Sequence, residues 1–144
     1  MLELFLAGWL LCTGAINVVS MLGEPLPPFA YPIGWRELDS GNDGYADWWL
    51  CASDREFTDI EPTLEAGFRE RGWRVLPGGE HSLDPGLLML AVRDDAKRCI
   101  GYHDLNVDSS LTANRWALID VQSDARSRAD DFDTILYVSG GNCG

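Results

Sequence analysis

Histidine and cysteine are the side chains of this sequence with the widest chemical range, because they bind metal ions, transfer protons or form disulfides. The histidines are His81 and His103, and Cys99 lies four positions before His103. The sequence around them predicts a strand, on which Cys99 and His103 would lie about 13 Å apart at ~3.3 Å per residue. That is too far for a shared metal ion; on a helix the two would be close. No CxxC or HExxH pattern is present, so the sequence predicts no metal site and no cofactor.

Nucleophilic catalysis has no signature in the sequence. A set of serine, histidine and aspartate can be drawn up from any chain of this length, but GxSxG and GxxxxGK[ST] are both absent. The glycine-rich run 139–144 ends the sequence, and no helix follows it to bind a phosphate. Catalytic residues therefore stay unknown at this level.

Residues before and at the start of the first predicted strand resemble part of a calcium-binding EF-hand loop. Asp39, Asp43 and Asp47 fall among the alternate positions that supply calcium ligands, and Gly44 allows the sharp turn. However, Gly41 occupies a position that requires Asp or Asn, and Leu50 occupies that of the bidentate Glu. A polar turn leading into a strand explains the pattern better.

Three cysteines fall in the predicted domain: Cys51, Cys99 and Cys143. In an oxidising compartment two of them can form a disulfide, although the spacing does not determine which two. In a reducing compartment all three would remain thiols, and a thiol packs as a small hydrophobic side chain.

The N-terminal segment 1–23 predicts a membrane anchor or a signal segment. No charge occurs from Leu4 to Leu22, and a helix over this stretch would span roughly 28 Å at ~1.5 Å per residue. Cleavage after Ser20 is the alternative, but Glu3 has the wrong sign for a signal peptide. A lipoprotein signal with Cys12 as acceptor and a buried core helix are the remaining interpretations. We expect residues 2–22 to hold the protein on a membrane, with the domain outside the cytoplasm.

Composition fits one small acidic domain. The chain has 144 residues, a formal net charge of −12 and no basic stripe. Such a charge repels the phosphates of nucleic acids, so nucleic acid is excluded as an expected partner.

Residues 24–44 are rich in proline and glycine and predict an extended spacer before a domain at 45–144. The first strand is predicted at Tyr45–Ala52, with Trp48 and Trp49 on opposite faces. If Trp48 is in the core, Trp49 and Tyr45 form an exposed contact site for a partner, or else the sheet is covered on both faces.

The remaining pattern gives one clear helix, with Asp59 as N-cap, Pro62 in its first turn and Gly72 at the C′ position. Further strands are predicted at 73–76, 87–93, 98–105, 115–121 and 134–139, and a long loop or short acidic helix at 123–133. The expected fold class is α+β: an antiparallel sheet of about five to six strands with one main helix packed on a face, preceded by an N-terminal hydrophobic helix.

These features favour a membrane-anchored extracytoplasmic domain that acts as an accessory or protein-interaction module. Two alternatives remain open. One is a small secreted or anchored hydrolase with a site built from loops, in which His81 or His103 would be essential. The other is an acidic cytosolic protein that neutralises a basic partner.

Overall fold

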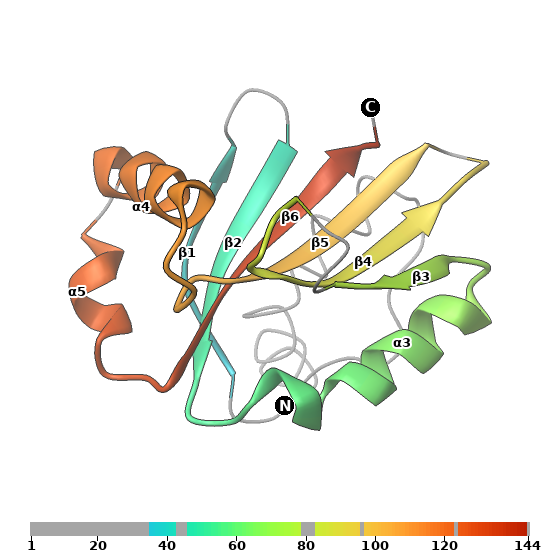
Figure 1. The fold of residues 1–144 in the computed structure, drawn as a ribbon, viewed down its shortest axis with the longest axis horizontal. Helices are drawn as coiled ribbons and strands as arrows, with labels where there is room; N and C mark the ends of the chain where they lie inside the picture. Colours follow the sequence, from blue (N-terminus) through green and yellow to red (C-terminus); the bar gives the residue numbers. More distant parts are fainter. Residues whose placement is uncertain (1–34, 43–45, 79–82, 96, 123, 144) are drawn as a thin grey trace, which may run out of the picture.

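A six-stranded antiparallel sheet forms the centre of the protein (Figure 1). The computed structural model describes residues 35–42, 46–78, 83–95, 97–122 and 124–143. The strands lie in the order β1-β2-β6-β5-β4-β3, and every neighbouring pair is antiparallel. Their bounds are β1 Arg36–Asn42, β2 Ala46–Ser53, β3 Arg74–Pro77, β4 Leu87–Arg93, β5 Arg98–Asp104 and β6 Thr134–Asn142. The predicted α+β class is thus confirmed.

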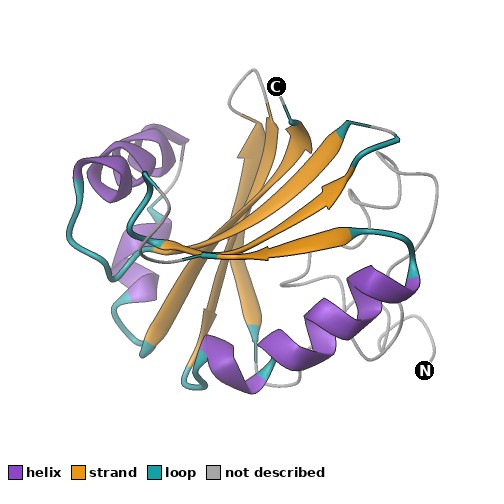
Figure 2. Cartoon of the chain, turned by 45° about the vertical axis from the view of Figure 1, so that its right-hand side comes forward, coloured by secondary structure: helices purple, strands orange, loops and turns teal. Residues whose placement is uncertain are grey.

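The sheet is buried on both faces. Strand β2 alternates as predicted, and its Trp48 and Trp49 are 0% and 1% exposed on opposite sides. Trp49 belongs to a first core with Phe68 and Tyr102, whereas Trp48 belongs to a second core with Trp116. Helices cover the two ends of the sheet on different sides of the molecule (Figure 2).

The first face is covered by α3 (Glu61–Glu70), which follows a short 3-10 helix, η2 (Phe57–Asp59). Leu64 and Phe68 are buried in the first core, because their spacing of four residues places them on one side of the helix. The helix begins one residue later than an N-cap at Asp59 would require, since Asp59 ends the 3-10 turn and Ile60 is the N-cap. Gly72 has a φ of +82°, the left-handed conformation expected just beyond a helix end.

The second face carries α4 (Ser110–Gln122) and α5 (Ala125–Ala129), and α4 occupies the residues 115–121 that were predicted as a strand. That prediction is wrong. The buried residues of α4 are Thr112, Trp116 and Ile119, a helical spacing, while Val121 is 86% exposed. Ser109 caps the helix, because its Oγ accepts a hydrogen bond from the Thr112 N–H at 3.1 Å. The sheet therefore carries more than the one main helix expected, and α5 realises the short-helix alternative.

Strand β1 lies within the segment predicted as a spacer. It pairs with β2, and its Leu38 is buried in the second core. The β1–β2 pairing shifts register between Glu37 and Asp39. Such an irregularity is common in an edge strand, and β1 contains Asp, Ser, Gly and Asn, which are more typical of turns. The predicted N-terminal helix and most of the spacer lie outside the described residues. Among the residues that are described, no helix is long and apolar enough to cross a membrane.

Candidate functional site

Four side chains from four separate segments meet on the second face of the sheet, beside α4. They are Asp84 from the turn before β4, His103 from β5, Arg115 from α4 and Tyr137 from β6. Asp84 Oδ2 lies 2.8 Å from His103 Nδ1 and accepts a hydrogen bond from Arg115 at 2.8 Å. The guanidinium of Arg115 also lies over the Tyr137 ring, with Cζ 5.5 Å from the centroid. We call these four residues the Asp84 network.

A turn places the carboxylate of Asp84. Its Oδ1 accepts a hydrogen bond from the Gly86 N–H at 3.0 Å, and its carbonyl accepts one from Leu87 at 3.1 Å. The carbonyl of Gly86 in turn accepts a 2.7 Å hydrogen bond from the Asp104 N–H, which fastens the turn to the end of β5. The Asp-Pro-Gly sequence of residues 84–86 favours such a turn.

Gly101 makes room for the imidazole of His103. A Cβ at Gly101 would lie 2.7 Å from His103 Nε2, closer than any side chain permits. The imidazole therefore lies above the backbone of β5, and its Nδ1 faces Asp84. Ser139 is the cross-strand neighbour of Gly101 on β6, so its hydroxyl lies on the same side of the sheet as Nε2.

Burial and charge set the protonation of the Asp84 network. Burial raises the pKa of Asp84, but the hydrogen bond and charge of Arg115, with the Gly86 N–H, outweigh it and hold this pKa below its ordinary value. Burial lowers the pKa of His103 from 6.5 to about 4, and Arg115 acts in the same direction against the opposing effect of Asp84. At neutral pH, His103 is therefore uncharged and its Nδ1–H donates to an ionised Asp84.

A cavity of about 410 Å³ adjoins the network between α4 and the ends of β2 and β6. Its apolar walls are Ala46, Leu111 and Leu118, together with the ring of Tyr137. Its polar lining groups are Asn114, Arg115 and Ser139. We call it the α4 cavity. It is large enough for a small organic ligand.

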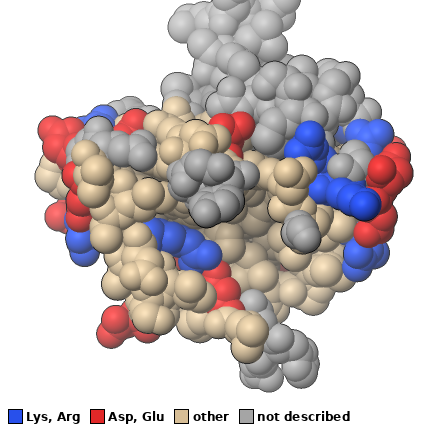
Figure 3. Space-filling view, turned by 90° about the horizontal axis from the view of Figure 1, so that it is seen from above, with Lys and Arg blue, Asp and Glu red and all other residues tan. Residues whose placement is uncertain are grey.

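The charge of Arg115 stands out in an acidic protein. On the face shown in Figure 3, Lys and Arg lie next to Asp and Glu at both sides and at one place nearer the middle, and uncharged residues surround that place. The Arg115 side chain is 18% exposed, compared with 52% to 57% for Arg74, Arg126 and Arg69 in their surface pairs. Within the described part of the chain, its NH1 atom is buried without a hydrogen-bond partner.

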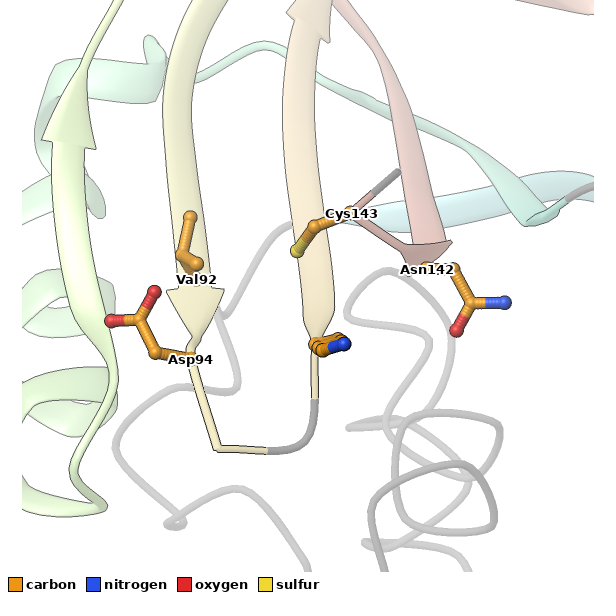
Figure 4. Close-up of a pocket in the computed structure, with 5 residues that line it drawn as sticks. Val92, Asp94, Asn142 and Cys143 are labelled. Carbon is orange, nitrogen blue, oxygen red and sulfur yellow. The ribbon is translucent and has the colours of Figure 1, made fainter.

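A second hollow, of about 520 Å³, lies at the end of strands β4, β5 and β6 (Figure 4). Its polar groups do not converge, because the side chains of Asp94 and Asn142 point away from each other. Both are also engaged elsewhere: Asp94 pairs with Arg74 at 3.0 Å, and Asn142 accepts a hydrogen bond from Arg98 at 2.6 Å. The α4 cavity is therefore the better candidate for binding.

The structure joins Cys99 to Cys143 in a disulfide, which the sequence left unassigned among three cysteines. Register explains the pairing, because Cys99 lies opposite Gly141 at the end of the β5–β6 ladder, two residues before Cys143. Cys51 is buried in the first core and takes no part in this disulfide.

Burial excludes Trp49 from the predicted partner contact at Trp49 and Tyr45, and it agrees with the alternative of a sheet covered on both faces. Trp49 is 1% exposed, because the first core covers that face of β2, and a partner cannot reach it. Tyr45 and His81 lie outside the described residues. The described residues contain no group of three or more histidine, cysteine or acidic side chains that could hold a metal ion.

Sequence reasoning missed most of the Asp84 network. Asp84 is not among the residues that the sequence singles out, and Arg115 falls in the strand predicted at 115–121. The available signal was the helical spacing of Thr112, Trp116 and Ile119, which turns Arg115 toward the sheet. No family model, no curated protein and no solved structure matches this chain, so the geometry alone carries the functional argument.

Proposed function

We propose that this protein is a membrane-anchored recognition domain that lies outside the cytoplasm and binds a ligand without transforming it. The α4 cavity is its binding site. The observation that carries the proposal is the guanidinium of Arg115, which is mostly buried at the wall of this cavity and has one nitrogen without a hydrogen-bond partner among the described residues. A buried charged donor of this kind is costly to leave unsatisfied. NH1 is closed off from solvent, so a ligand reaches it when the Arg115 side chain shifts toward the cavity, and the acceptor that the ligand brings then removes the cost.

Binding fits the geometry better than catalysis does. Asp84 is hydrogen-bonded to both His103 Nδ1 and Arg115 NH2, and Nε2 of His103 forms no hydrogen bond to a hydroxyl or thiol of the described residues. A pKa of about 4 also makes His103 a weak base at neutral pH, whereas general bases work best when their pKa lies near the working pH. The network holds α4 and the turn at 84–87 against the sheet, which preserves the shape of the cavity.

The disulfide supports the proposed location. Disulfides such as Cys99–Cys143 generally form and persist in oxidising compartments outside the cytoplasm. Fractionation of cells with thiol labelling tests this on the full-length chain and on a chain lacking residues 1–23. We expect the full-length protein in membranes, with Cys99 and Cys143 labelled only after reduction, and the shorter chain in the soluble fraction. Soluble full-length protein whose cysteines are all labelled without reductant would contradict it.

Blocking the mouth of the cavity tests recognition itself. Asn114 is exposed and lines the α4 cavity, so Asn114→Trp should close it, while Ala117→Trp places the same side chain on an exposed part of α4 outside the lining. Thermal unfolding of the full chain is measured in the presence of each compound of a library of small cations, anions and neutral molecules. A compound that stabilises the wild type and Ala117→Trp but not Asn114→Trp is expected. A library without any such compound argues against recognition at this cavity.

One observation favours a hydrolase as the second candidate. His103 has the Asp84 partner of a catalytic dyad, and Ser139 lies across from Gly101, over which Nε2 is placed. A shift of Ser139 toward Nε2 would complete a serine–histidine–aspartate arrangement. Hydrolysis of an activated ester separates the two candidates: a hydrolase loses activity in both His103→Asn and Ser139→Ala, and a recognition domain shows no activity that these substitutions remove.

A further inference from the structure

We propose that the α4 cavity binds a monocarboxylate that carries a short apolar stem. The inference rests on the proposed recognition function and specifies its ligand. The carboxylate would accept hydrogen bonds from Arg115, with Ser139 and Asn114 beside it, and the stem would lie against the apolar walls. Each part of this ligand corresponds to a feature of the cavity.

Three polar side chains of the lining have hydrogen-bonding capacity left. Arg115 NH2 donates to Asp84, but NH1 has no acceptor among the described residues. The side chains of Ser139 and Asn114 likewise form no hydrogen bond within the described part of the chain. A carboxylate has two oxygens that accept several hydrogen bonds, so one group can satisfy donors from both α4 and β6.

Charge selects a monoanion. Arg115 is the basic side chain of the cavity lining, and Asp84 already neutralises part of its charge from the other side. A dianion such as a phosphate monoester would add a second negative charge without a second cation, in a protein of net charge −12. A neutral amide would fill the same space but would lack the charge-assisted hydrogen bond.

The remaining walls select an apolar stem. Ala46, Leu118 and the Tyr137 ring contribute carbon surface, and Leu111 is 37% exposed at the rim. A cavity of about 410 Å³ leaves room for several carbon atoms beyond the carboxylate. Both a free organic acid and the C-terminal residue of a peptide have this chemistry.

Two pairs of probes separate the contribution of the ligand's charge from that of its apolar stem. They also distinguish a free organic acid from the C-terminus of a peptide as the ligand. Pentanoate and pentanamide form one pair; acetyl-alanyl-leucine with a free or an amidated C-terminus forms the other. Affinity is measured with the full chain in detergent. We expect at least one acid to bind about tenfold or more tightly than its amide, since the charge-assisted hydrogen bond is lost in the amide. The pair of probes that shows this preference identifies the source of the carboxylate.

Substitutions at the cavity lining, and one conservative substitution within the Asp84 network, test the site. Ser139→Ala should weaken binding of the acid several-fold, and Asn114→Trp should abolish it, while Ala117→Trp leaves it unchanged. Arg115→Lys keeps the positive charge but loses the planar fork, and it should reduce the preference for acid over amide.

Two results would overturn the carboxylate inference, and they differ in what they imply for the proposed recognition function. Equal affinity for acid and amide, with both blocked by Asn114→Trp, refutes the carboxylate but keeps recognition at the α4 cavity. No binding of any of the four probes also refutes the carboxylate. In that case recognition stands only if another compound of the library stabilises the wild type and not Asn114→Trp.

Discussion

Protonation of His103 gives the Asp84 network a stability that depends on pH, and the substitution His103→Asn tests it. Asparagine keeps a side-chain N–H that can donate to Asp84 but does not titrate. Burial lowers the pKa of His103 from 6.5 to about 4 in the folded protein. Between these two values the unfolded chain binds a proton that the folded chain does not, so the free energy of unfolding falls as the pH falls.

The expected size follows from the two pKa values. Taking 6.5 for the unfolded chain and about 4 for the folded one, His103 makes the protein about 2 kcal/mol less stable at pH 5 than at pH 7.5. Urea unfolding of the wild type and of His103→Asn at both pH values measures this. The wild type should exceed His103→Asn in free energy of unfolding by about that much less at pH 5 than at pH 7.5. Ordinary carboxyl groups stay ionised in both proteins at pH 5.

The comparison of the two proteins isolates His103 from the other titrating groups, His81 included. A difference between wild type and His103→Asn that stays constant from pH 7.5 to pH 5 would refute the reasoning. A difference that grows toward pH 5 would show that Asp84 raises the pKa of His103 more than burial and Arg115 lower it.

Three further variants test the packing of the sheet and its disulfide. Gly101→Ala places a Cβ 2.7 Å from His103 Nε2 and should lower the free energy of unfolding by about 1–3 kcal/mol, measured in urea at pH 7.5; an unchanged value would contradict the placement of the imidazole. Replacing both Cys99 and Cys143 by serine opens a loop of 44 residues and should cost about 4 kcal/mol on the chain-entropy model. Reductant should then destabilise the wild type but not the double variant. Trp49→Ala should cost about 3–5 kcal/mol because its side chain is buried, and a loss typical of a surface site would show that this face of β2 is open.

The sequence predicts most of the sheet because alternation over a short strand has a simple cause. Buried positions of β2 recur every second residue on each face, and the β4–β5 hairpin closes through the polar turn at 94–97. Tyr102 and Ile100 continue the same pattern into β5. The prediction of these strands depends on local periodicity, which can be read from a single sequence.

The region 110–122 was misread because its residues fit two periods. Ala117, Ile119 and Val121 alternate like a strand, but Trp116 and Ile119 follow a helical spacing. The structure has the helix α4 here, and Ser109 caps its N-terminus. Strand β1 was missed for a different reason: its turn-type residues become a strand only through pairing with β2, a contact that local propensity does not contain.

The candidate site could not be predicted because its members are far apart in the sequence. Asp84 and Arg115 are 31 residues apart, and both depend on the packing of α4 over the second face for their contact. The sequence identified His103 as chemically interesting but offered no partner for it. A network assembled from a turn, two strands and a helix appears only once the fold is known.

The most direct test of the proposed recognition site follows the side-chain N–H groups of Arg115 by NMR. The full chain, labelled with ¹⁵N and held in detergent, is titrated with the acid that binds and with its amide, and Arg115→Lys assigns the signal. The account predicts a saturable shift of the Arg115 signals with the acid, a much smaller shift with the amide, and no shift for Arg74, whose pair with Asp94 lies outside the cavity lining. Arg115 signals that stay unchanged at saturating acid, or that move equally with the amide, would contradict it.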